Sequence, residues 1–147
     1  MIKSGIGYDV HSLAEGEELI IGGVKINSPW GSVGHSDGDV LLHAIVDALL
    51  GAAKLGDIGM HFTSSDERWK GKESIYFLDH AALLVREQGF EIDYVDSTVI
   101  LEEPKLADII PEMVYKVSYT LHIDEAAVSI KATTTDKMGF IGRGEGV

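Results

Sequence analysis

The chain has 147 residues, a formal net charge of −12 and no cysteine, and its length predicts one domain with its own core over residues 1–147. Its acidic balance argues against a broad surface for nucleic acid or anionic membranes, which needs clustered lysine and arginine, but permits a phosphorylated small substrate. Without cysteine there are no disulfides or thiolate metal sites, and no apolar run approaches the ~20 residues of a membrane span, so we expect a soluble cytoplasmic protein.

The N-terminal segment, residues 2–11, alternates in the manner of a strand. Tyr8 and Val10 would face one side, while Asp9 and His11 face the other. Because side chains two residues apart on a strand share a face, both polar groups can reach one ion. The segment therefore combines a predicted strand with a potential metal-binding pair.

A hairpin and a loop precede the strongest helix signal in the chain. Apolar triplets at 19–21 and 24–26 flank a Gly-Gly pair that is typical of a tight turn. Ser36 is a suitable N-cap for a helix over 37–53, with Asp39 three residues later as in a capping box.

The later elements alternate between helices and strands. After a long connection rich in glycine, serine and aspartate, the pattern predicts a helix over 74–88, a strand over 92–101, a helix over 111–121 and a strand over 127–133. This order indicates an α+β fold, that is, a mixed α/β domain in which helices cover one face of a small mixed β-sheet. Oligomerisation would then bury the uncovered face.

Asp9, His11 and His43 form the set that is most suited to a metal ion. Two imidazoles and a carboxylate with an open fourth position are typical of catalytic zinc, although Mn²⁺, Fe²⁺ or Co²⁺ also accept such ligands. The alternative is that His43 is an ordinary buried histidine of the helix. Spacing alone leaves both interpretations open.

Two other stretches suit phosphate groups. His35 and Ser36, at the expected helix entrance, can donate hydrogen bonds to an anion beside the free N–H groups of the first turn, although ordinary capping explains them equally well. Residues 131–137, Lys-Ala-Thr-Thr-Thr-Asp-Lys, place hydroxyls and a carboxylate at a strand end, where a hydrated divalent cation could bind. Threonine runs also occur simply because threonine favours strands.

Five motifs in order along the chain resemble one family of enzymes. They are GYDVHSL at 7–13, GHSDGDVLLHAIVDALLGA at 34–52, LGDIG at 55–59, the Pro104-Lys105 turn and KATTTDKMGFIGRGEG at 131–146. Together they resemble the 2-C-methyl-D-erythritol 2,4-cyclodiphosphate synthases. The resemblance implies a phosphorus–oxygen lyase of the non-mevalonate isoprenoid pathway that converts 4-diphosphocytidyl-2-C-methyl-D-erythritol 2-phosphate into the cyclic diphosphate and CMP. It also implies homotrimers of mixed α/β subunits whose sheets pack together, with an active site at each subunit interface.

The resemblance also implies roles for individual residues. The implied ligands of one zinc ion per subunit are Asp9, His11 and His43, and Asp136 is the implied ligand of a second cation, Mg²⁺ or Mn²⁺. His35 and Thr134 match transition-state stabilisers. The residues that match substrate contacts are, in chain order, Asp9, His11, His35, Ser36, Asp57, Ile58, Gly59, Phe62, Asp66, Leu101, Pro104, Lys105, Leu106, Ala107, Ala132, Thr133, Thr134, Asp136, Phe140 and Arg143.

The chain departs from the family pattern in one loop. Relatives commonly read Phe-Pro-Asp-x-Asp where this chain has Phe62-Thr-Ser-Ser-Asp66, so Ser64 replaces the first aspartate. Farther along, Arg143 and Glu145 match residues near the three-fold axis, where relatives can hold an isoprenoid diphosphate. The competing functions are a metal-dependent phosphohydrolase and a non-catalytic nucleotide-binding module, and the lack of an evident general base disfavours hydrolysis.

Overall fold

The computed structural model describes all residues from Met1 to Val147. In chain order its elements are β1 (Leu13–Glu15), β2 (Leu19–Ile21), β3 (Val24–Ile26), β4 (Trp30–Ser32), α1 (Val40–Ala52), α2 (Ile58–His61), α3 (Ser74–Glu87), β5 (Val95–Ile100), α4 (Ile110–Leu121), the 3₁₀ turn η1 (Glu125–Ala127), β6 (Val128–Thr133) and α5 (Gly139–Gly142). The longest helix has 14 residues, and none is both long and apolar enough to cross a membrane.

The strands pair two by two into three short ladders. β1 lies antiparallel to β4, and β2 lies antiparallel to β3 across the turn made by Gly22 and Gly23. β5 and β6 run parallel, with Val95 opposite Val128. The predicted hairpin is therefore confirmed, and the two later strands form the parallel part of a mixed α/β fold.

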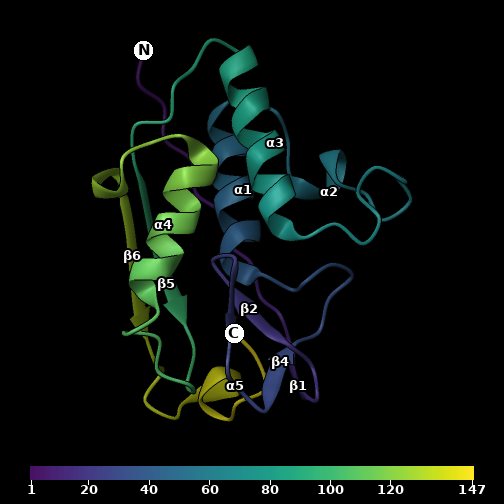
Figure 1. Cartoon of the computed structure of the whole chain (residues 1–147), viewed down its shortest axis with the longest axis vertical. Coiled ribbons are helices and arrows are strands. Elements are labelled where there is room, and N and C mark those ends of the chain that lie inside the picture. Colours follow the sequence, from purple (N-terminus) through teal and green to yellow (C-terminus); the bar gives the residue numbers. More distant parts are fainter.

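Helices cover one face of the β5–β6 ladder. Val95 and Val99 on β5, and Val128 and Ile130 on β6, are buried, while the residues between them are more exposed. α1 contacts β5, α4 contacts β6, and α1 packs against α3. Figure 1 shows α1 and α3 side by side, with α4 next to β5 and β6. The expected mixed α/β architecture, with helices on one side of the strands, is confirmed.

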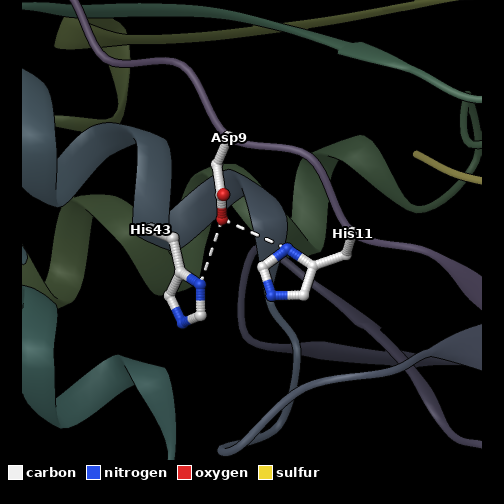
Figure 2. A group of neighbouring side chains, drawn as sticks. All are labelled: Asp9, His11 and His43. Carbon is white, nitrogen blue, oxygen red and sulfur yellow. Dashed lines mark hydrogen bonds and ion pairs between the residues drawn. The ribbon is translucent and has the colours of Figure 1, made fainter. Parts of the chain in front are cut away.

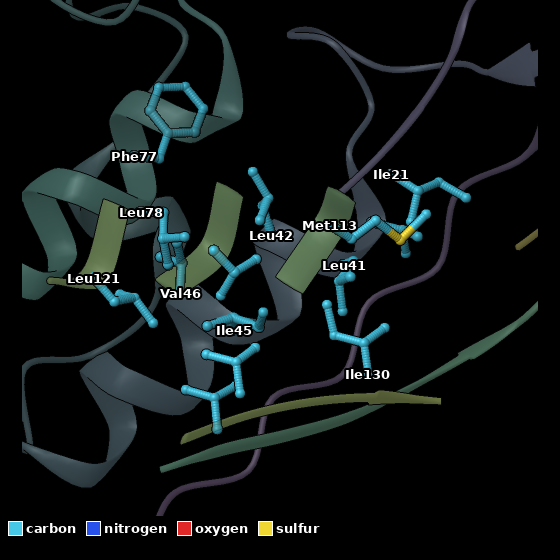
Figure 3. Close-up of a cluster of buried hydrophobic side chains, with 14 of the residues drawn as sticks. Ile21, Leu41, Leu42, Ile45, Val46, Phe77, Leu78, Met113, Leu121 and Ile130 are labelled. Atoms are coloured by element: carbon cyan, nitrogen blue, oxygen red, sulfur yellow. The ribbon is translucent and has the colours of Figure 1, made fainter. Parts of the chain in front are cut away.

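A core of 28 buried hydrophobic residues is built largely around α1. Leu42, Val46 and Leu50 of this helix are fully buried. Figure 3 shows Leu42 and Val46 clustered with Leu78 of α3 and Met113 of α4. Each such side chain contributes about 1.5–3 kcal/mol by its removal from water. The helix that carries His43 is therefore anchored on several sides.

The start of α1 differs from the prediction, which placed the N-cap at Ser36. The N-cap is Asp39, whose Oδ1 accepts hydrogen bonds from the Leu42 and Gly22 amides at 3.0 and 2.9 Å. Its Oδ2 accepts from the Gly23 amide at 2.7 Å. Both glycines have positive φ, so the hairpin turn directs free N–H groups at Asp39, which is completely buried. A contact with a distant turn thus decides where the helix begins.

Residues 2–11 do not form the predicted strand. No backbone–backbone hydrogen bond involves residues 1–10. Together with α1 and β5, these residues line a cavity of about 730 Å³. The segment instead lies directly against α1. At Gly7 the two are so close that an added Cβ would come within 1.7 Å of the Ala44 carbonyl oxygen. Ile6 and Tyr8 are 91% and 77% exposed. The alternation is that of a strand, but no other strand pairs with it.

Candidate active site

Asp9, His11 and His43 lie together at the N-terminal end of α1. Asp9 and His11 come from the N-terminal segment, and His43 comes from the first turn of α1. Figure 2 shows the Asp9 carboxylate facing both rings, with Oδ2 at 3.2 Å from His43 Nδ1 and 3.2 Å from His11 Nδ1. One ligand atom from each residue lies within 4.8 Å of the others. The three side chains can therefore share a single ion.

The charges in this cluster favour a cation. Burial would raise the pKa of Asp9, but its close contacts with the neighbouring rings of His11 and His43 outweigh burial and lower that pKa well below its usual value. The Asp9 carboxylate in turn raises the pKa of His11, against the opposing effect of burial. An ionised carboxylate thus lies between two ring nitrogens.

The Nδ1 atom of His11 gives independent support for a metal site. It is buried and has no hydrogen-bond partner of suitable geometry, despite its 3.2 Å separation from Asp9 Oδ2. A buried polar atom without a partner is costly, and a bound ion would satisfy it. Two imidazoles and a carboxylate fit Zn²⁺, Mn²⁺, Fe²⁺ or Co²⁺ and leave room for a further ligand. The residues present therefore fit a divalent metal ion.

Polar side chains also lie behind His43, on the side away from Asp9. His43 Nε2 is 2.7 Å from Ser74 Oγ, and Ser74 donates hydrogen bonds to Asp37 from both its hydroxyl and its backbone N–H. Ser36 Oγ is farther from the same ring nitrogen, at 3.4 Å. Neither Ser74 nor Asp37 is among the predicted site residues. The only local signal for Ser74 is its place at the start of a predicted helix.

Other residues predicted for the site surround the helix entrance. His35 is exposed on the loop before α1, and Ser36 is half-buried. Asp57 is the N-cap of α2, followed by the half-buried Ile58 and the exposed Gly59. Asp47 of α1 accepts a hydrogen bond from the Ile58 amide at 2.7 Å. This bond fixes the predicted substrate turn to the helix that carries His43.

Phe62 and Asp66 are held by neighbours within the connection between α2 and α3. The ring of Phe62, which is 9% exposed, has its centroid 4.8 Å from that of Phe77 and 4.9 Å from that of Trp69. Asp66 pairs with Arg68 at 2.8 Å. Any substrate contact by Phe62 would therefore use the small exposed part of its ring.

The predicted substrate contacts within residues 101–107 and 132–136 meet where β5 and β6 end. The Leu101 amide donates to the Thr133 carbonyl at 2.9 Å, which extends the parallel ladder by one bond. Glu102 accepts hydrogen bonds from the Thr135 and Lys137 amides at 3.3 and 3.2 Å, so this carboxylate, which was not predicted, joins the two loops. Leu101 and Leu106 are buried, Pro104 is half-buried, and the exposed predicted residues are Lys105, Ala107, Ala132, Thr133, Thr134 and Asp136.

The last predicted residues belong to α5 and its C-terminal cap. Phe140 is 41% exposed, and Arg143 donates two hydrogen bonds to Glu145 at 3.0 and 3.2 Å. No hydrogen bond or ion pair joins the 101–107 and 132–136 loops to the Asp9, His11 and His43 cluster. Within one chain, these loops and the Asp9, His11 and His43 cluster thus form two groups of predicted site residues that no polar contact connects.

Residues 2–147 match the sequence model of the YgbB family. The chain belongs to the YgbB family. This YgbB chain is 51% identical to a 2-C-methyl-D-erythritol 2,4-cyclodiphosphate synthase from Alkaliphilus metalliredigens over 146 residues, which are 99% of this chain and 92% of that protein. It is 49% identical to a synthase of the same name from Azotobacter vinelandii, over 99% of this chain and 93% of the relative.

Solved structures agree with this family assignment. The bifunctional IspDF from Campylobacter jejuni matches with a TM-score of 0.94 at 45% identity, over 99% of this chain but only 40% of that longer one. The IspF–CDP complex from Plasmodium falciparum matches with a TM-score of 0.85 at 37% identity, over 98% of this chain and 88% of the other. The resemblance inferred from five motifs is thereby confirmed at the level of the family.

Proposed function

We propose that this YgbB-family chain, as a single domain over residues 1–147, is a phosphorus–oxygen lyase that forms 2-C-methyl-D-erythritol 2,4-cyclodiphosphate. The observation that carries this proposal is the convergence of Asp9, His11 and His43, in a chain about half identical to synthases of that name over nearly their whole length. The substrate is 4-diphosphocytidyl-2-C-methyl-D-erythritol 2-phosphate, and the second product is CMP. The pathway is non-mevalonate isoprenoid biosynthesis, for which we expect a cytoplasmic location.

The reaction is an intramolecular phosphoryl transfer. An oxygen of the 2-phosphate attacks the β-phosphorus and forms a new P–O bond, while the bond from the β-phosphorus to the bridging oxygen breaks and CMP leaves with the electron pair. Both reacting groups belong to one substrate, so the protein chiefly has to hold them about 3–3.5 Å apart and in line. No covalent enzyme intermediate is required.

The residues around the cluster have distinct tasks in this scheme. A Zn²⁺ ion held by Asp9, His11 and His43 would supply Lewis-acid stabilisation of phosphate charge. The exposed His35 can donate a hydrogen bond to a phosphate oxygen. Thr134 Oγ1 accepts from the Asp136 amide at 3.1 Å, which leaves its own hydroxyl proton available for a phosphate oxygen. The exposed carboxylate of Asp136 would bind the second cation, Mg²⁺ or Mn²⁺.

We also propose that the two groups of site residues meet across the interfaces of a homotrimer. Large apolar side chains such as Ile2, Ile6 and Tyr8 are 94%, 91% and 77% exposed, which favours burial against other subunits. Light scattering should then give a mass three times that of the 15.9 kDa chain, and a monomer would contradict the arrangement. An isoprenoid diphosphate near Arg143 on the three-fold axis remains a prediction from the resemblance.

The decisive test is ³¹P NMR of the purified protein with the diphosphocytidyl substrate, Zn²⁺ and Mg²⁺. The expected result is a cyclic diphosphate signal that appears together with CMP. Linear phosphates would instead indicate a phosphohydrolase, and an unchanged spectrum with measurable CMP binding would indicate a binding module.

Two histidine variants sharpen the test. His43→Ala should abolish turnover because it removes a ring from the cluster. His122→Asn is the matched control, since His122 lies at the C-cap of α4 in a left-handed conformation that asparagine tolerates. It should retain wild-type turnover. Full activity of zinc-free His43→Ala would exclude the proposed metal role.

A further inference from the structure

We infer that Ser74 and Asp37 are positioning residues for His43, which they hold in the one tautomer that can bind a metal ion beside Asp9 and His11. The inference rests on the proposed metal role of His43 and adds two residues to it. Ser74 is the first residue of α3 and is completely buried. Its hydroxyl oxygen lies 2.7 Å from His43 Nε2, the ring nitrogen that points away from the cluster.

The hydroxyl proton of Ser74 decides the direction of this hydrogen-bond chain. Ser74 Oγ donates to Asp37 Oδ1, and a hydroxyl has only one proton to donate. The contact with His43 must therefore have the ring as donor, with the proton on Nε2. In a neutral imidazole the other nitrogen, Nδ1, then carries a free lone pair. That lone pair faces Asp9 Oδ2 at 3.2 Å, within the cluster.

Without Ser74 the opposite tautomer gains an advantage. A proton on His43 Nδ1 would find an acceptor in Asp9 Oδ2, and this tautomer has no lone pair to offer a metal ion at Nδ1. Ser36 Oγ does not replace Ser74, because its separations from His43 Nε2 and Asp37 Oδ1 are 3.4 and 3.5 Å. Ser74 thus disfavours the Nδ1–H tautomer of His43, in which the proton would compete with the metal ion for Nδ1.

Asp37 also caps α3 through a second contact, so the effect of the Ser74 hydroxyl on His43 can be tested separately from helix capping. Its Oδ2 accepts from the backbone N–H of Ser74 at 2.9 Å, whereas Glu73, the residue before α3, makes no side-chain capping bond. Replacement of Ser74 by alanine keeps this backbone bond and removes only the hydroxyl. A loss of function in Ser74→Ala therefore cannot be ascribed to loss of the cap on α3.

The test compares Ser74→Ala with Ser118→Ala. Ser118 is also a buried helical serine, 2% exposed, but its hydroxyl bonds only to the Tyr115 carbonyl of its own helix. The first readout is the tautomer of His43 in the zinc-free protein, from ¹⁵N-detected imidazole NMR, with the signal assigned by its absence in His43→Ala. The second is the Zn²⁺ dissociation constant, measured by competition with a chromophoric chelator.

We expect Ser74→Ala to lose the Nε2–H signature of His43 and to bind Zn²⁺ about 10–100-fold more weakly, the usual range for removal of such a supporting partner. Ser118→Ala should match the wild type in both readouts, and Ser74→Thr, which keeps the hydroxyl, should restore the tautomer. The inference is overturned if Ser74→Ala keeps both the tautomer and the Zn²⁺ affinity of Ser118→Ala. It is also overturned if the wild type binds no Zn²⁺.

A second variant, Asp37→Asn, tests the same chain of hydrogen bonds if Ser74→Ala does not fold. Asp37→Asn replaces a charged acceptor by a weaker neutral one at constant size, so it should weaken Zn²⁺ binding in the same direction, and an unchanged affinity would refute the chain of hydrogen bonds. Failure of the proposed function is distinguishable from failure of this inference. A protein with no cyclase activity whose Zn²⁺ affinity depends on Ser74 would reject the first and support the second.

Discussion

Replacement of Asp39 by alanine should destabilise the protein by about 3 kcal/mol at pH 7. The substitution removes the N-cap bond to the Leu42 amide, worth about 1 kcal/mol. It also leaves the amides of Gly22 and Gly23 without their acceptor, at about 1–3 kcal/mol for a buried group and less for the partly exposed Gly23. The alanine variant no longer has to bury a carboxylate, and this gain offsets part of the lost stability. For a chain of this size, 3 kcal/mol corresponds to a fall in Tm of about 6–12 °C.

Chemical denaturation followed by circular dichroism measures this loss. Asp124→Ala is the matched control, because Asp124 caps the η1 turn through one bond to the Ala126 amide, at 2.9 Å and on the surface. Its removal should cost no more than about 1 kcal/mol. If Asp39→Ala costs no more than Asp124→Ala, the bonds from Gly22 and Gly23 to Asp39 do not contribute measurably to stability.

Three further outcomes are expected. Because Asp9 raises the pKa of His11, Zn²⁺ affinity should fall roughly tenfold per pH unit below that pKa, as competition titrations from pH 8 to 5 would show. Burial raises the pKa of Asp39 to about 6, above its unfolded value near 3.9, so the folded chain binds the extra proton and the stability of wild type relative to Asp39→Asn should fall as pH rises from about 4 to 6. Gly7→Ala should lower Tm because its Cβ would meet the Ala44 carbonyl oxygen at 1.7 Å, whereas Gly51→Ala, with open space around the new methyl, should gain about 0.5–1 kcal/mol.

Elements with a local signal were predictable from the sequence. The apolar spacing of α1 and the glycine pair between β2 and β3 determine a helix and a turn without help from the rest of the chain. The metal cluster was predictable in part for a related reason. Asp9 and His11 are two residues apart and can reach one ion from an extended segment. Their approach to His43 joins distant parts of the chain and was predicted from ligand chemistry and from the resemblance to the family.

Features that depend on distant contacts were not predictable. Asp39 caps α1 because a hairpin turn from elsewhere in the chain offers it two amides, and Ser74 reaches His43 only because α3 packs on α1. β4 consists of three residues, Trp30–Ser32, in a stretch marked by proline and glycine, where no alternation exists to reveal a strand. The strand predicted over 2–11 failed for the reverse reason, since alternation was present but a partner strand was not.

The N-terminal segment links metal loading to local order. Residues 1–10 make no backbone–backbone hydrogen bonds, yet Asp9, one of the proposed ligands, lies among them. In the metal-free protein their amide protons should exchange with solvent nearly as fast as those of an open chain, because no ladder has to break first. An ion bound by Asp9 and His43 would fasten the segment to α1, so slower exchange and greater resistance to proteolysis near the N-terminus should accompany metal uptake. The rate of amide exchange in the first residues of the chain should thus show whether a metal ion is bound.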